Sequence, residues 1–226
     1  LLAQRAGFVQ GVGNSSFATA RSSAGTATGG TSGGTAGIAF RYFFSAGRGG
    51  GTHSMYRTFL YFDTTGVAAS AANIVITGIS NNAGSFVLAK ATAFGGDGGS
   101  ALDTADFTEI TTTAYSTQQS TFNIGTNTIA LNSTAVTDIT NNDAFIVAFM
   151  NNTNDFANTA ATSNTTLNNG VNFGFITGGG FSSIKLSYTA AATSDVTSIN
   201  TIARSSITSF STIALANIDE INRIDN

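Results

Sequence analysis

The 226-residue chain has no cysteine, no proline and no tryptophan, and its only histidine is His53. Without cysteine it has neither a disulfide framework nor a thiolate metal site. A single histidine excludes a histidine-based metal cluster, so we expect His53 to be structural. No stretch approaches the roughly 18 consecutive apolar residues that cross a bilayer. We therefore expect no membrane span and no bound cofactor, with the calcium candidates below as the exception.

Charge is also scarce, at 9% of residues, and it is unevenly distributed. Residues 1–62 contain five basic residues and no acidic one. The five are Arg5, Arg21, Arg41, Arg48 and Arg57. They predict either docking on an acidic partner or internal pairing with the acids that lie later in the chain. No dense basic patch accompanies them and the net charge is −3, so nucleic-acid binding is not expected.

Gly, Ser, Thr and Asn together account for 106 residues, yet hydrophobic residues reach 42% and include 18 Phe. Disordered chains combine few apolar residues with high net charge, so this chain has the composition of a folded protein. Thr, Val, Ile, Phe and Tyr favour pleated, half-buried surfaces. The composition therefore predicts an all-β protein.

The order of apolar segments and turns predicts an antiparallel jelly-roll β-sandwich without a long helix in the first 190 residues. We divide the chain into an N-terminal strand and flexible loop (1–37), the sandwich (38–190) and a C-terminal tail (191–226). A single helical turn is expected over 102–110, with Asp103 as its N-cap. Strands are expected over 6–12, 38–44, 53–63, 72–79, 85–94, 128–132, 144–150, 171–177 and 184–189.

Residues 56–79 carry the strongest pattern, which predicts two strands joined by a Gly-containing turn as a hairpin. The first strand has apolar or aromatic side chains on both faces and one charge near each end, Arg57 and Asp63. No partner for either charge is evident in the sequence. We therefore expect the two charges to close the ends of a central strand whose residues 59–62 fill the core.

The tail from residue 191 repeats an apolar pattern every 11 residues. Its large apolar positions are Ile199, Ile202, Ile207, Phe210, Ile213, Ile218, Ile221 and Ile224. As a helix, this period places them on one face with a slight right-handed supercoil. The segment is also rich in mediocre helix formers, so a β ladder is an equal alternative. Either form predicts a docking or oligomerisation tail, with a trimer as the first expectation.

Few residues suggest chemistry. Asp97, Asp103 and Asp106 near the glycines of residues 95–99 are weak candidates for calcium, which prefers oxygen ligands. Asp138 with Asp143, and the segment 151–155, are weaker ones. Glycoside hydrolysis needs two acids that face each other across a cleft, and no motif provides such a pair. We therefore expect a protein that is not an enzyme.

Several blocks resemble jelly-roll structural proteins of marine bacteriophages and environmental viruses. They are residues 57–65, 87–99, 131–139, 142–148 and, in the tail, 213–224. The resemblance implies a structural protein at the virion surface, in an extracellular setting, as a capsid decoration, fibre or tail component that contacts itself and other virion proteins.

Two alternatives remain open at this point. One is a receptor- or glycan-binding head for host attachment, in which Asn-rich loops near Tyr115 and Phe156 would contact a host surface glycan. The absence of tryptophan weakens this alternative. The other is a subunit of a bacterial extracellular filament or surface layer, in which the strand over 6–12 would insert into a neighbouring subunit.

Overall fold

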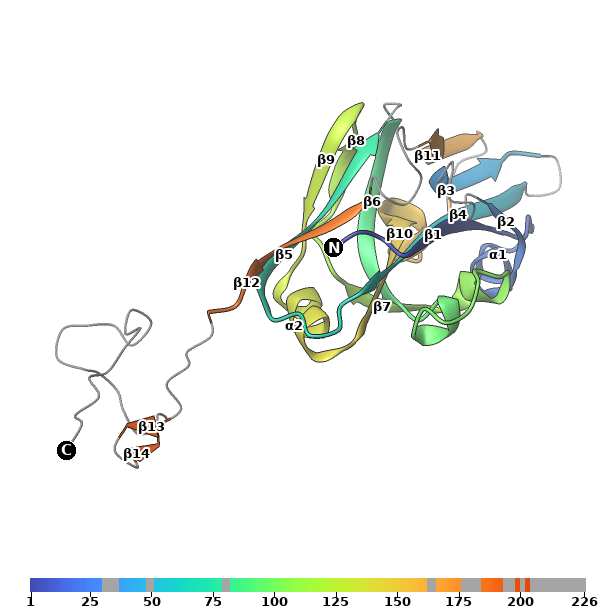
Figure 1. Cartoon of the computed structure of the whole chain (residues 1–226). Helices are drawn as coiled ribbons and strands as arrows, with labels where there is room; N and C mark the ends of the chain where they lie inside the picture. Colours follow the sequence, from blue (N-terminus) through green and yellow to red (C-terminus); the bar gives the residue numbers. More distant parts are fainter. Residues whose placement is uncertain are drawn as a thin grey trace, which may run out of the picture.

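The structure is a computed structural model (Figure 1). It describes residues 1–29, 37–47, 51–78, 82–161, 166–175, 184–192, 198–199 and 202–203. Two antiparallel sheets of unequal size contain most of this part of the chain. The predicted all-β, antiparallel, sandwich-like architecture is confirmed, and the finer assignment to a jelly roll stays a prediction.

The larger sheet contains nine of the described strands, in the main order β11-β3-β4-β10-β6-β7. Around this path, β1 pairs with both β4 and β2, and β8 pairs with β6. The nine strands are β1 (Arg5–Gly11), β2 (Gly25–Gly29), β3 (Gly37–Ser45), β4 (Thr52–Asp63), β6 (Asn82–Ala91), β7 (Ile110–Ala114), β8 (Gln119–Phe122), β10 (Ala144–Asn151) and β11 (Leu167–Phe175). Strand β2 lies in the segment 1–37, where the sequence predicted a flexible loop after the first strand, and β7 and β8 were not predicted.

The smaller sheet has the order β12-β5-β9, with β5 (Ala69–Gly78) between β9 (Gly125–Ala130) and β12 (Lys185–Ala190). The first residues of the chain continue this sheet, because the Leu1 amino group donates to the Leu186 carbonyl and the Leu186 N–H donates back to Leu1. Strand β1 then crosses to the larger sheet. The N-terminal segment thus contacts both sheets of its own chain.

The prediction of a hairpin over 56–79 is wrong. Strand β4 belongs to the larger sheet and β5 to the smaller one, so the turn between them carries the chain from one sheet to the other. Gly66 in this turn has φ +72°, a conformation that glycine adopts at little cost. The exposed Asp63 carboxylate accepts from the Thr65 N–H at 3.0 Å, which stabilises the departure from β4.

The first core lies between the two sheets. The inward side chains of β5 alternate with its outer ones, and Ile74 and Ile76 are fully buried against the larger sheet. Three phenylalanines from β3, β6 and β10 form the centre of its aromatic part: the ring centroids of Phe40 and Phe86 are 4.7 Å apart, and those of Phe86 and Phe149 are 5.7 Å apart. Such tilted and offset ring pairs add to the stabilisation that apolar burial provides.

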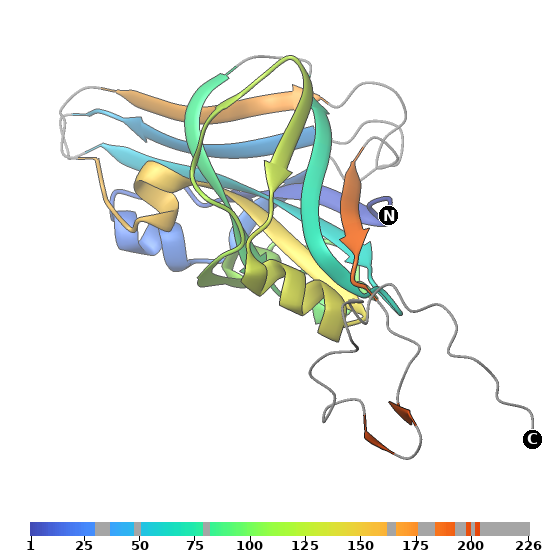
Figure 2. The same ribbon diagram turned by 90° about the vertical axis from the view of Figure 1, so that its left-hand side faces the viewer.

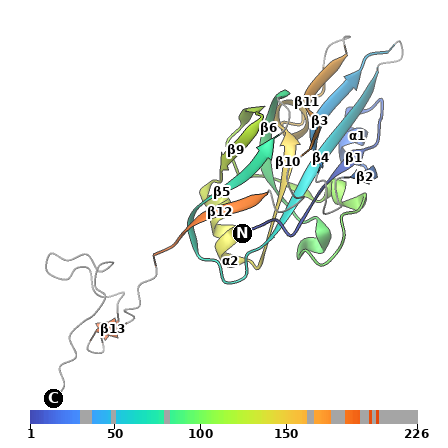
Figure 3. The same ribbon diagram turned by 45° about the horizontal axis from the view of Figure 1, so that its top comes forward.

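The second core lies on the opposite face of the larger sheet, which short helical segments and their connecting loops cover (Figure 3). These segments are α1 (Phe17–Ser22), η1 (Phe94–Gly96), η2 (Ala105–Thr108) and η3 (Asn152–Phe156). Strand β4 therefore has a core on each side, as its two-faced apolar sequence predicted. Phe59 points toward the helical cover, and Leu60 and Phe62 belong to the core between the sheets.

Helix α2 (Ser133–Asn141) lies across the end of the two sheets and packs against β5 and β10 (Figure 2). This helix was not predicted, because Ser, Thr, Val and Ile are mediocre helix formers. The local signal was the N-cap: the Asn132 side chain accepts from the Ala135 N–H at 3.0 Å. Ala135 and Ile139, four residues apart, are the two fully buried positions of the helix.

In the tail, the structure describes two short antiparallel strands, β13 (Ser198–Ile199) and β14 (Ile202–Ala203). At these four residues the backbone is β rather than helical. The other predicted tail contacts lie outside the described residues. They are Ile207, Phe210, Ile213, Ile218, Ile221 and Ile224.

Candidate functional site

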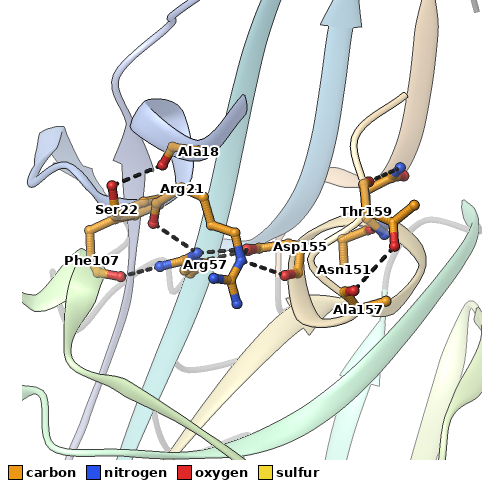
Figure 4. A network of polar contacts seen from close by, with 10 residues as sticks. Ala18, Arg21, Ser22, Arg57, Phe107, Asn151, Asp155, Ala157 and Thr159 are labelled. Atoms are coloured by element: carbon orange, nitrogen blue, oxygen red, sulfur yellow. Dashed lines mark hydrogen bonds and ion pairs between the residues drawn. The ribbon is translucent and has the colours of Figure 1, made fainter. Parts of the chain in front are cut away.

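The most extensive charged group in the described part of the chain surrounds Arg57 (Figure 4). Its guanidinium donates to both carboxylate oxygens of Asp155, from Nε at 2.7 Å and from Nη2 at 2.6 Å. Nη1 donates to the Phe107 carbonyl at 2.5 Å, and the Phe107 ring centroid lies 4.0 Å from the guanidinium carbon. Arg21 Nε donates to the Asp155 carbonyl at 2.7 Å. We call these four residues the Arg57 cluster.

The Arg57 cluster joins four segments that are distant in sequence: α1, β4, η2 and η3. The Asp155 side chain is fully buried and that of Arg57 is 4% exposed. A buried carboxylate is tolerated only with a partner of opposite charge and with its oxygens hydrogen-bonded, and the bidentate arginine supplies both. The expectation that no partner converges on Arg57 is wrong, because Asp155 lies 98 residues further along the chain. Phe156, the neighbouring glycan-contact candidate, packs half-buried in the second core.

The calcium candidates serve the backbone of their own loop. Asp97 Oδ1 accepts from the Gly99 N–H at 2.7 Å, and Asp103 Oδ1 accepts from the Ala105 N–H at 2.7 Å. Asp106 accepts from the Asp103 N–H at 3.0 Å, and burial raises the pKa of Asp106. Within the described ranges, no group of three or more His, Cys, Asp or Glu side chains is arranged to hold a metal ion. The three carboxylates thus accept from amides of their own loop. Asp103 bonds to amides at the start of η2, as expected, but the N-cap position of this segment is Thr104 rather than the predicted Asp103.

His53 lies in the second core, 6% exposed, where the sequence predicted a structural role. Its Nδ1 is 2.6 Å from the Tyr42 hydroxyl, which also accepts from the Ala161 N–H at 3.1 Å. The rings of Phe17 and Phe44 pack against the imidazole at 5.6 and 4.8 Å between centroids. Burial lowers the pKa of His53, which favours the neutral imidazole, and the ring completes the packing of this region.

A different group of polar side chains opens to solvent. Lys90 at the end of β6 donates from Nζ to Asp138 Oδ2 on α2 at 2.8 Å, and the Tyr115 hydroxyl donates to the same oxygen. They line a cleft of about 460 Å³ together with Asn141 and Asp143. We call this the Lys90 cleft. Asp138, Asp143 and Tyr115 were separate candidates in the sequence, and only the fold brings them together with Lys90.

The electrostatics of the Lys90 cleft follow from these contacts. Burial alone would raise the pKa of Asp138, but the hydrogen bonds from Lys90 and Tyr115 and the Lys90 charge hold it below its ordinary value. Burial also raises the pKa of Tyr115, and the hydrogen bond from the Tyr115 hydroxyl to the Asp138 carboxylate raises it further. At neutral pH the Asp138 carboxylate is therefore ionised and the Tyr115 phenol is neutral, and both lie beside Lys90 Nζ.

Four of the five N-terminal arginines fall within the described ranges. Arg21 and Arg57 belong to the Arg57 cluster, Arg5 donates to a backbone carbonyl at 2.7 Å, and Arg41 lies 4.5 Å from the centre of an aromatic ring. Arg48 lies outside the described residues. Arg21 and Arg57 thus pair with an acid of their own chain, as the second interpretation predicted, whereas Arg5 and Arg41 contact a carbonyl and an aromatic ring.

Comparisons with protein-family models, with curated proteins and with solved structures find no match. None of the helices described here is long and apolar enough to cross a lipid bilayer. The function is therefore argued from the chain itself.

Proposed function

We propose that the chain is a structural protein of a bacteriophage virion, a capsid decoration, fibre or tail component built on a jelly-roll sandwich and displayed at the particle surface. The observation that carries the proposal is the Arg57 cluster. In the part of the chain before the tail (residues 1–190, called the body below), the most extensive charged interactions are buried and join four distant segments. Such interactions stabilise a scaffold rather than present groups to a substrate.

The distribution of the remaining side chains supports the same role. The two cores contain most of the large apolar residues of the body, and the exposed positions of the described strands are mostly Thr, Ser and Ala. Such an uncharged polar surface suits a protein packed at high density beside copies of itself. In this proposal the chain is not an enzyme.

Assembly is assigned to the tail, residues 191–226. Its 11-residue apolar repeat supplies the surface that would be buried between copies, and a symmetric trimer is the proposed state. Strand β1 pairs with β4 and β2 of its own chain. Insertion of β1 into a neighbouring subunit, as in the filament alternative, would require these pairings to be given up.

Two measurements test the proposal. Antibodies against the body should detect the protein on virus particles that are separated from soluble protein in a density gradient. Sedimentation of the full chain should give three times the 23.0 kDa mass of one copy, and a chain ending at residue 190 should sediment as a monomer. A protein found only in the soluble fraction would contradict the proposed place in the virion. A full-length chain that sediments as a monomer would contradict the proposed trimer.

The Lys90 cleft favours a second candidate function, a receptor- or glycan-recognising head on the same scaffold. Small-molecule sites orient their ligand with a few fixed polar side chains, and the Lys90 cleft offers Lys90, Asp138 and Asn141 for this purpose. The two functions are compatible, because a surface-displayed virion protein can also contact the host.

A further inference from the structure

We infer that the Lys90 cleft binds a neutral saccharide of one or two rings. The inference rests on the second candidate function and is independent of the proposed trimer, since every residue that lines the cleft belongs to the body. Its volume, about 460 Å³, falls within the range of small-molecule sites, roughly 300–1,000 Å³.

The polar groups of the cleft are held in place before any ligand binds. The Tyr115 ring stacks on Phe145 with 5.2 Å between centroids, and the backbone N–H of Tyr115 donates to the Leu88 carbonyl at 2.7 Å. Asn142 donates from Nδ2 to the Asp138 carbonyl at 2.9 Å, which closes the end of α2. Because these contacts fix the shared Asp138 oxygen, little ordering of side chains would oppose binding.

Hydrogen-bonding capacity remains for a ligand. An ammonium has three N–H donors, and Lys90 gives one of them to Asp138 while its side chain is 38% exposed. The exposed side chains of Asn141 and Asp143 lie at the rim and add an amide and a second carboxylate. The cleft thus offers donors and acceptors side by side.

This mixture of groups decides the class of ligand. A sugar hydroxyl both donates and accepts, so one hydroxyl can bond to a carboxylate while its neighbour accepts from the ammonium. An anion such as phosphate would meet two carboxylates, and a bare divalent cation would meet the ammonium that already neutralises Asp138. Tyr115 is 2% exposed and contributes only its hydroxyl, so recognition here uses hydrogen bonds rather than ring stacking.

The affinity of such a site is modest. A monosaccharide has about a dozen non-hydrogen atoms, and the efficiency usual for small ligands corresponds to a Kd on the order of 1 mM. Presentation of several copies on one particle would raise the effective affinity for a polysaccharide.

The test is an NMR titration of the isotope-labelled full chain with glucose, galactose, mannose and N-acetylglucosamine, each measured separately. We expect at least one sugar to give saturable shifts at Lys90, Asn141 and Asn142. The variants Lys90→Met and Asn141→Ala should each weaken binding about tenfold. The chain supplies a matched control, because its only other lysine, Lys185, is an exposed residue of β12. Lys185→Met should bind like the wild type.

Each other outcome overturns the inference. These outcomes are the absence of saturable shifts with all four sugars, shifts elsewhere on the body, and equal binding by the wild type and Lys90→Met. Tighter binding of inorganic phosphate or of Ca²⁺ alone would show that the cleft takes an ion instead. Thermal melting of each variant confirms that a loss of binding does not reflect unfolding. Sedimentation of the same samples measures whether they are trimers, so a failure of sugar binding can be distinguished from a failure of the assembly proposal.

Discussion

Removal of the Asp155 carboxylate should strongly destabilise the fold. In Asp155→Ala, the Arg57 guanidinium loses both bonds to the carboxylate and keeps only its carbonyl acceptors at Phe107 and Arg21. The Arg57 side chain is 4% exposed, so bulk water replaces the lost partner poorly. Leaving one charge of a buried pair without its partner costs about 3–5 kcal/mol. That is a large part of the roughly 5–15 kcal/mol by which native proteins are stable.

Urea unfolding followed by circular dichroism measures the effect. With a slope of about 2 kcal/mol per molar urea, the midpoint should fall by roughly 2 M. The control is Lys90→Met, which removes an ion pair whose lysine is 38% exposed. Exposed pairs contribute about 0–1 kcal/mol, so this variant should unfold close to the wild type.

A double variant separates the cost of an unpaired charge from the contribution of the pair itself. Arg57→Met with Asp155→Leu removes both charges and keeps apolar volume in the core. Replacement of buried ion pairs by apolar residues is often neutral or stabilising, so the double variant should regain most of the loss. The reasoning is refuted if Asp155→Ala unfolds at the same urea concentration as Lys90→Met, or if the double variant is less stable than Asp155→Ala.

Three further predictions concern backbone geometry, pH and helix capping. Gly98 has φ +81°, and a Cβ there would lie 2.2 Å from the Tyr61 ring, so Gly98→Ala should lower the melting temperature by more than the several degrees that the backbone conformation alone would cost. The same change at Gly96, with φ +83° and open space, should cost only the backbone term of about 1–2 kcal/mol. Burial lowers the pKa of His53 in the folded protein, so on acidification the imidazole takes up a proton more readily in the unfolded chain than in the folded one. The free energy of unfolding should therefore fall as pH drops below about 6.5. His53→Asn should flatten that dependence in melts between pH 7.5 and 5.5, and an unchanged slope would contradict it. Asn132→Ala should destabilise α2 by about 1 kcal/mol in urea unfolding, and no change would disprove the capping role.

The candidate site shows where prediction from the sequence stopped. The residues that carry chemistry, Arg57, Lys90 and Asp138, were visible as isolated charges in a chain with few of them. Their partners were not, since Asp155 is 98 residues from Arg57 and Asp138 is 48 residues from Lys90. Sequence spacing identifies partners only within one helix or one turn, as with Asp103 and the amides of its own loop.

The sequence by itself determined the β class and most of the long strands, because alternation of apolar residues and the positions of turns are local properties that one stretch of chain contains. It also determined that β4 is buried on both faces. Only the tertiary structure decided that β4 and β5 lie in different sheets, that α2 forms among residues of modest helix propensity, and which charges meet. These outcomes depend on burial shared between distant segments, and a single stretch of sequence does not contain that free energy.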